Sequence, residues 1–355
     1  MAELLPPLHL RPGRWPAITG ARRLPLGQLL QGRPAAAVPA LMGQLFSLCA
    51  GAQSQVAQWA LALAQGQAAE TVFDLAARHR LVEAAMREHL RHILLDWPRC
   101  LGAVLDAPAA QEPLRRLWQA PPGTPGDWLK TLQACLYGEP PETWLARRMA
   151  GAEAMRDWLH RAGTAPARTL AACAPGLLAQ PLPAAAGVES LLFDERIAEL
   201  ARQAWHEPDF AVYPQWHGTR ETGCWQRLAR RRAMPGPSTV LERLLDRLEE
   251  VARLATGDAR LHSGGGALEP GCGYAWTETA RGVLLHVAAQ DAAGRVAGYR
   301  AVAPTEWNFH PHGSLAGCIA ALPAGDAARC AALAAAFDPC LAFTVAPACE
   351  VAAHA

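Results

Sequence analysis

ETARGVLLHV at residues 278–287 and GRVAGYRAVAPTEWN at residues 294–308 are the stretch that decides the fold. The first segment alternates between side chains of different polarity, and the second begins with a glycine and ends at a proline, a pattern typical of two paired strands. We therefore predict a β-hairpin that leads into residues 305–308, Thr-Glu-Trp-Asn. Arg281 falls near the start of the first predicted strand, where an arginine is ordinarily exposed.

Downstream of this hairpin, residues 337–346 read FDPCLAFTVA. Asp338 and Pro339 form a pair that is common in turns. A cysteine in a tail rich in alanine and leucine, here Cys340, is usually a small buried apolar residue. By itself this segment carries little functional information.

Upstream, three segments have helical patterns. Residues 50–64 are rich in alanine and leucine and follow Cys49, which is ordinarily a core cysteine at the start of a helix. Residues 81–97 are amphipathic, and Pro98 is predicted to end this helix. His89 and His92 lie on its apolar side, and without a third ligand we interpret them as core-lining or partner-contacting. Residues 240–254 carry one apolar stripe after Pro237-Ser238-Thr239, which we interpret as the helix cap.

The composition excludes several classes of protein. Thirty-three Lys and Arg balance thirty-two Asp and Glu in 355 residues, which argues against nucleic acid as a partner and for protein or small-molecule partners. None of the ten cysteines forms a Cys-x-x-Cys pair, so neither a disulfide scaffold nor a structural zinc site is predicted. The N-terminus lacks the pattern of a signal peptide, and no apolar run reaches the length of a membrane span. We expect a cytoplasmic protein with no membrane partner.

Taken together, the motifs resemble those of the large subunits of nickel-iron hydrogenases. Arg281, Gly282, Leu284 and His286 match a Pro-Arg-Gly-x-Leu-x-His segment, and residues 304–308 match Pro-Thr-Thr-Trp-Asn. Further matches are a Leu-Asp-Trp helix at residues 95–97, a Glu-Thr-Gly loop that begins at Glu221, and Asp-Pro-Cys at residues 338–340. The resemblance implies an α+β fold that is predominantly α, with a central helix bundle and small β-hairpins at its periphery.

The departures from this resemblance indicate a particular branch. The family closes with Asp-Pro-Cys-x-x-Cys-x-x-His, whereas this chain has Phe343 and Ala346 at the last two ligand positions. The first metal motif of the family is damaged in the same way, with Phe46 for one cysteine, Gln53 for the histidine and Cys49 retained. Four thiolates hold nickel in a hydrogenase, and two cannot. The pattern is similar to the HupK/HoxV proteins, which are accessory proteins of hydrogenase maturation.

This resemblance implies a scaffold for iron and no nickel. Cys49 and Cys340 would hold an Fe(CN)2(CO) intermediate, and Arg281 would donate to a cyanide nitrogen. Gln53, Asp338, Pro339, His286 and Glu221 would support these residues or the local structure. Because Gln53 and Ala346 replace histidines, we expect weak support of the ligands and transient binding. Only Cys49 corresponds to an iron ligand of the family, so Cys340 would need a different rotamer or a shifted iron. Alternatively, Cys340 serves during transfer, or a partner supplies the missing ligand.

Three hypotheses follow from the residues and the resemblance. The first is an assembly scaffold that is not an enzyme, with the hydrogenase large-subunit precursor, a HypC-type chaperone and other Hyp maturation proteins as partners. The second is a hydrogenase-like redox enzyme, against which the loss of two thiolates and of a family glutamate argues. The third is a metal-free interaction protein that mimics the large subunit. For domains, we predict an N-terminal half at 1–163, a Pro-rich connection at 164–187 and a C-terminal half at 188–355, packed as one large-subunit-like domain.

Overall fold

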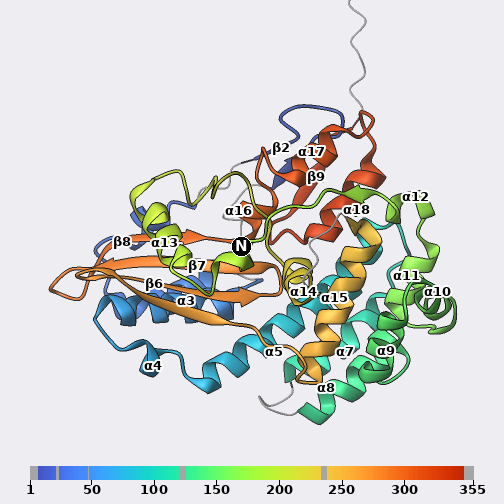
Figure 1. The fold of residues 1–355 in the computed structure, drawn as a ribbon, viewed down its shortest axis with the longest axis horizontal. Coiled ribbons are helices and arrows are strands. Elements are labelled where there is room, and N and C mark those ends of the chain that lie inside the picture. The colour runs from blue at the N-terminus through green and yellow to red at the C-terminus, as the bar shows by residue number, and fades with distance from the viewer. Residues whose placement is uncertain (1–6, 21–23, 47, 120–124, 233–237, 348–355) are drawn as a thin grey trace, which may run out of the picture.

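The computed structural model describes residues 7–20, 24–46, 48–119, 125–232 and 238–347. These residues form a mainly helical protein with three small sheets among the described segments. A four-stranded sheet lies to one side in Figure 1, and most of the longer helices lie to the other. The prediction of an α+β fold that is predominantly α is therefore confirmed.

The predicted hairpin belongs to an antiparallel sheet with the strand order β5-β6-β7-β8. Its strands are β5 (Ser263–Glu269), β6 (Cys272–Thr279), β7 (Gly282–Gln290) and β8 (Val296–Val302). The pairing of β7 with β8 confirms the hairpin. The single strand predicted at 278–287 is wrong, because Thr279 pairs with Gly282 and the chain reverses between them. Arg281 therefore lies in a tight turn.

This sheet is enclosed by helices. Every residue of β6 and all but the last residue of β7 are buried. Helix α3 (Ala50–Ala64) covers one face and α13 (Arg196–His206) covers the other (Figure 1). A Cβ on Gly273 would lie 2.4 Å from the backbone nitrogen of Ala64, so the contact with α3 requires a glycine. Both faces of the strands are apolar and both are covered, although the sheet lies to one side of most of the longer helices (Figure 1).

The helix predicted at 81–97 is longer and changes its geometry. Helix α5 (Leu75–Arg91) passes into a π-helical turn, η2 (His92–Asp96), and then into α6 (Trp97–Cys100). The prediction that Pro98 ends the helix is wrong. Pro98 stands in the first turn of α6, where its missing N–H is tolerated. The π-turn brings His92 Nδ1 to within 3.1 Å of Asp96 Oδ2.

Helix α15 (Val240–Ala255) confirms the predicted apolar stripe, whose side chains lie in the largest core cluster. The Thr239 hydroxyl caps it by accepting from the N–H of Glu242, while Pro237 lies outside the described residues. The opposite side of this helix is also buried, although it is charged. It carries Arg243, Asp246, Arg247, Glu249, Glu250 and Arg253.

The other helices complete this core and cover the sheet. They are α1 (Leu26–Leu30), α2 (Val38–Leu45), α4 (Ala69–Val72), α7 (Ala107–Gln119), α8 (Pro125–Leu132), α9 (Pro141–Ala150), α10 (Ala152–Arg161), α11 (Ala165–Ala172), α12 (Pro175–Leu178), α14 (Cys224–Arg232), α16 (Pro304–Asn308), α17 (Ser314–Ala320) and α18 (Ala327–Phe337). No helix in the described part of the chain is long and apolar enough to cross a bilayer.

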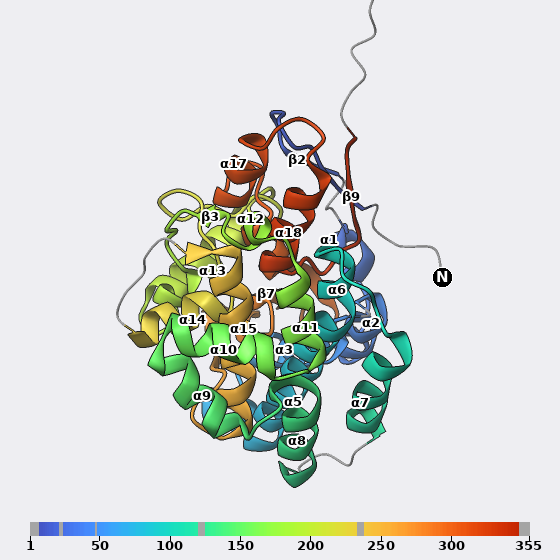
Figure 2. The same ribbon diagram turned by 90° about the vertical axis from the view of Figure 1, so that its right-hand side faces the viewer.

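The two smaller sheets join segments that are distant in sequence. Strand β1 (Leu8–Leu10) lies between β2 (Ile18–Thr19) and β9 (Phe343–Val345), and it runs parallel to β9. Figure 2 shows this meeting of the two ends of the described chain. Strand β3 (Pro181–Leu182) pairs with β4 (Ser238–Thr239). The predicted connection at 164–187 contributes Leu170 and Leu182 to the same core as α15, and the division of the chain there stays a prediction.

Candidate functional site

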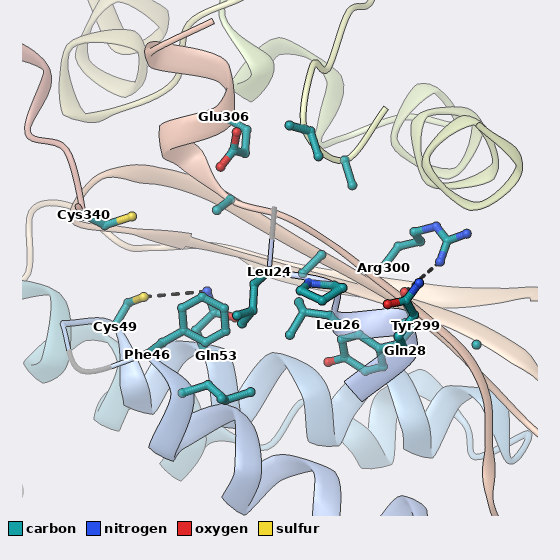
Figure 3. A pocket seen from close by; sticks show the side chains of 18 of the residues that line it. Leu24, Leu26, Gln28, Phe46, Cys49, Gln53, Tyr299, Arg300, Glu306 and Cys340 are labelled. Atoms are coloured by element: carbon teal, nitrogen blue, oxygen red, sulfur yellow. Dashed lines mark hydrogen bonds between the residues drawn. The ribbon is translucent and has the colours of Figure 1, made fainter. Parts of the chain in front are cut away.

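A cavity of about 1140 Å³ lies where α3, β8, α16 and the segment after α18 meet. Figure 3 shows Cys49 and Cys340 at one end of this cavity, with Glu306 nearby and Arg300 and Gln28 toward the other end. Cys49 immediately precedes α3, and Cys340 follows α18 by three residues. The fold thus brings the two predicted thiols into one cavity from opposite ends of the sequence.

Both thiols are partly buried and have a polar neighbour. The Thr305 hydroxyl donates to the Cys340 sulfur at 2.9 Å, and the Cys340 N–H donates to the same hydroxyl at 3.2 Å. Burial raises the pKa of Cys49, and the nearby Cys340 raises it further. Burial also raises the pKa of Cys340, although Arg281 and the hydrogen bond from Thr305 oppose this shift. A metal that binds here has to displace two protons.

Asp338 turns the chain from α18 into the Cys340 segment. It ends the helix with a φ of 50°, a left-handed conformation that aspartate tolerates better than most residues. Its buried carboxylate lies 3.1 Å from Arg247 Nη1, 3.1 Å from His92 Nδ1 and 3.3 Å from Arg281 Nε. Burial alone would raise the pKa of Asp338, but Arg281, His92 and Arg247 lower it well below its usual range. The buried Pro339 follows and restricts the backbone before Cys340.

Arg281 is buried, with 3% of its surface exposed, so the ordinary expectation of an exposed strand-end arginine does not hold. Its Nη1 forms an ion pair with Glu88 of α5, and its Nε faces Asp338. Burial would lower the pKa of Arg281, but Asp338, Glu88 and the two thiols raise it. Nη2 has no hydrogen-bond partner among the described residues. One donor of a permanently charged fork is therefore unused, in a side chain whose charge affects the pKa values of both thiols.

The turn that carries Arg281 is held by two other matched motifs. The N–H of Val283 donates to the Thr222 hydroxyl at 2.8 Å. The Asn308 side chain bonds both the N–H and the carbonyl of Thr222, at 2.9 and 2.8 Å. Glu221 itself contacts Arg243 at 2.8 Å and the Trp225 indole at 2.9 Å, and it does not line the cavity. Its place supports a structural role.

Gln53 contacts Cys49, contrary to the expectation that the loss of a histidine removes support from the ligand. Its amide nitrogen donates to the Cys49 sulfur at 3.6 Å, as Figure 3 shows. Its oxygen lies 2.9 Å from His286 Nε2, and the Tyr299 hydroxyl lies 2.7 Å from His286 Nδ1, both within hydrogen-bond distance. Glutamine is long enough to reach the sulfur from one helical turn away, so a polar contact survives.

The two histidines of α5 and η2 are core residues, as one alternative predicted. His89 is fully buried between Glu250, at 2.9 Å, and Arg247, at 2.8 Å. His92, Asp96 and Asp338 place three possible metal-ligand atoms within 4.8 Å of one another. Among the described residues, neither Cys49 nor Cys340 belongs to a group of three such ligands. Three arginines surround this group, and the second nitrogen of His92 contacts the Ala335 carbonyl at 2.9 Å. We interpret it as an ion-pair network.

Sequence reasoning missed Glu88, Thr305, Tyr299 and Arg247. Glu88 shares the apolar side of its predicted helix with Ala85 and His92. A carboxylate on an apolar side could have indicated that Glu88 has a buried partner. Thr305 stood in a matched motif but was not singled out. Tyr299 and Arg247 reach the site only through the fold, because their partners lie 13 and 158 residues away in sequence.

Glu189 supports the Thr222 loop and makes stability depend on pH. Its carboxylate accepts from the Thr222 hydroxyl at 2.7 Å and from the Gly223 N–H at 2.8 Å, and burial raises its pKa to about 7. The pKa of a glutamate in the unfolded chain is about 4.3. Between that pH and about 7, Glu189 is protonated in the folded state and ionised in the unfolded state. Its contribution to the free energy of unfolding therefore falls as the pH rises through this range. We expect Glu189→Gln to gain up to about 3 kcal/mol relative to the native protein between pH 5 and 7.

Urea unfolding at pH 5, 6 and 7 measures this difference, and the exposed Glu70→Gln serves as the control. A constant difference between Glu189→Gln and the native protein over this range contradicts the prediction.

The fold is similar to that of solved hydrogenase structures. It matches a [NiFeSe] hydrogenase from Desulfovibrio vulgaris Hildenborough with a TM-score of 0.55 at 14% identity, covering 91% of this chain and 92% of that chain. It also matches an NAD+-reducing [NiFe]-hydrogenase with a TM-score of 0.52 at 15% identity, covering 91% of both. The chain therefore shares its fold with these hydrogenase chains. No family model matches it.

Curated relatives define the branch. The chain is 34% identical to the hydrogenase expression/formation protein HoxV of Cupriavidus necator, over 95% of this chain and 94% of that protein. It is 32% identical to HupK of Bradyrhizobium diazoefficiens, over 93% and 91%. The chain belongs to the HoxV/HupK family of hydrogenase expression/formation proteins.

Proposed function

We propose that this protein is an accessory scaffold in nickel-iron hydrogenase maturation, which holds an Fe(CN)2(CO) fragment through Cys49 and Cys340 before transfer. The observation that carries the proposal is the meeting of both thiols in one cavity beside a buried arginine. These are the residues that the damaged motifs retain. A protein that only kept the fold would have no need of two thiols in one cavity with a buried cation close enough to affect their pKa values.

The donor set suits this cargo. Low-spin Fe(II) with two cyanides and one carbonyl already has three strong ligands, and two thiolates make a five-coordinate anionic unit. Arg281 offsets its negative charge, and the Nη2 atom without a partner offers a donor to a cyanide nitrogen. The raised pKa values of both thiols mean that protons compete with the metal, which favours release. Nickel would need thiolates that this site lacks.

We also propose that the protein is not an enzyme. The relatives are named expression/formation proteins, which supports an accessory role in maturation. The partners we propose are the hydrogenase large-subunit precursor, which receives the iron, and a HypC-type chaperone with other Hyp proteins, which deliver it. The cytoplasm is the proposed location. A partner that enters the cavity from its open side reaches both sulfurs.

The size of the cavity favours a second candidate, a metal-free protein that mimics the large subunit to engage maturation factors. The cavity extends far beyond the two thiols, and leucines, Phe46 and prolines line much of it. A small iron fragment fills little of about 1140 Å³, whereas a segment of a partner protein would fill more. In this case the two thiols are dispensable.

Infrared spectroscopy of protein purified without oxygen, together with iron and nickel analysis, separates the two candidates. We expect cyanide and carbonyl bands with iron and without nickel, and we expect Cys49→Ala and Cys340→Ala each to lose them. Cys318→Ala removes a partly buried thiol that does not line the cavity, and it should keep the bands.

Maturation of the host hydrogenase is scored in parallel. Metal-free protein without these bands, together with thiol variants that still support maturation, would exclude the scaffold and leave the interaction protein. Loss of the bands in only one thiol variant would assign the iron to a single cysteine and give the other a different role.

A further inference from the structure

A chain of hydrogen bonds through three buried side chains ends at Cys49. It begins at the Tyr299 hydroxyl on β8, passes through both ring nitrogens of His286 on β7 and through the Gln53 amide on α3, and reaches the Cys49 sulfur. Figure 3 shows Tyr299 and Gln53 on the wall of the cavity that holds the thiol. His286 and Tyr299 have no exposed surface, and Gln53 is only 2% exposed.

The donors and acceptors of this chain allow two directions. A neutral imidazole has one N–H and one bare nitrogen, and burial keeps His286 neutral by lowering its pKa to about 3. In the first direction Tyr299 donates to Nδ1, Nε2 donates to the Gln53 oxygen, and the Gln53 NH2 group faces the sulfur. In the second direction each bond is reversed and the Gln53 oxygen faces the sulfur.

The Tyr299 hydroxyl decides between these directions. In the second direction its proton would need another acceptor, and the hydroxyl bonds no other group among the described residues. A buried O–H without an acceptor is costly, so the first direction is favoured. Tyr299 and Gln53 are not in contact, because His286 lies between them. The tautomer of His286 therefore links the direction of the Tyr299 hydrogen bond to the orientation of the Gln53 amide.

We propose that Tyr299 is a positioning residue, which acts through His286 to hold the Gln53 amide so that its NH2 group donates to the Cys49 sulfur. The consequence for iron rests on the proposed function. A donor to a thiolate withdraws electron density from the sulfur and weakens its bond to the metal. The chain thereby makes Cys49 a weaker ligand, which suits a site that has to release its cargo.

The first test uses metal-free protein and does not depend on the proposed function. Long-range proton–nitrogen NMR of protein labelled in histidine reports which ring nitrogen of His286 carries the proton. We expect the Nε2–H tautomer alone in the native protein and a mixture of both tautomers in Tyr299→Phe, which removes one oxygen atom. His286→Gln identifies the signals. The Nδ1–H tautomer in the native protein, or an unchanged pattern in Tyr299→Phe, overturns the proposal.

The second test uses the iron-loaded protein. Tyr299→Phe and Gln53→Leu should both shift the carbonyl stretch to lower wavenumber, because more electron density on sulfur raises back-donation from iron into the carbonyl. Gln28→Leu changes an amide at the other end of the cavity and should leave the band in place (Figure 3). An unchanged band in Gln53→Leu overturns the effect on the metal. Native protein without any band refutes the scaffold and leaves the NMR result standing.

Discussion

Replacing Arg281 by methionine is expected to destabilise the protein by about 3–5 kcal/mol, the usual cost of removing one partner from a buried ion pair. The variant leaves Glu88 without its ion-pair partner Arg281 and removes one of the two guanidinium groups that form ion pairs with Asp338. Neither carboxylate is well placed to recover water, because Asp338 is 2% exposed and the Glu88 side chain is 13% exposed. Equilibrium unfolding in urea measures the loss.

Arg329→Met is the matched control. Arg329 also pairs with an aspartate, Asp326, at 3.0 Å, but its side chain is 44% exposed. A surface pair of this kind contributes up to about 1 kcal/mol. Equal losses in the two variants contradict the view that Arg281 holds the site together. Arg281→Lys keeps the charge but not the planar fork, so it should recover stability more fully than it recovers iron.

Gly282→Ala is expected to cost roughly 3 kcal/mol or more, since a strained backbone and a steric clash coincide there. The residue has a φ of +133°, and an added Cβ would lie 2.4 Å from two atoms of the Thr222 side chain. The clash separates the Arg281 turn from the loop that holds it. We therefore expect this variant to lose iron binding together with stability, and urea unfolding gives the stability part.

Gly294→Ala isolates the backbone contribution. This glycine also has a positive φ, +70°, but nothing lies within 4 Å of its added Cβ. Its substitution should cost only about 1–2 kcal/mol, the strain of a left-handed alanine. If Gly282→Ala is no worse than Gly294→Ala, Thr222 yields to the methyl group and the turn is not fixed by this contact.

The elements that depend on local sequence patterns were predicted correctly. The helix at 240–255 follows from its apolar period, and the pairing of β7 with β8 follows from two adjacent strand patterns. The same reasoning failed at Arg281, because the two-residue turn of Ala280 and Arg281 contains neither proline nor a typical hairpin pair, and Gly282 was assigned to the strand. It also did not predict that helices enclose the sheet, since burial on both faces depends on helices from other parts of the chain.

The site was predicted in part, and for a different reason. Cys49, Cys340 and Arg281 were proposed as site residues because they stand in motifs that resemble a known family. Spacing alone would not have joined two cysteines so far apart. The ion pair of Arg281 with Glu88 and the contact of Tyr299 with His286 depend on three-dimensional packing. No local signal in one sequence encodes these pairings.

The parallel pair of β1 and β9 can form only late in synthesis, because its two strands lie near opposite ends of the chain. His9 and Thr344 bond at 2.8 Å across 335 residues, so β1 is made long before its neighbour exists. At about 5–20 residues per second, the ribosome needs roughly 15–70 seconds to make this intervening chain. Cys49 emerges early and Cys340 late. If both sulfurs hold the cargo, as we propose, a nascent chain that ends before Cys340 lacks one of the two ligands, and loading has to follow the synthesis of Cys340.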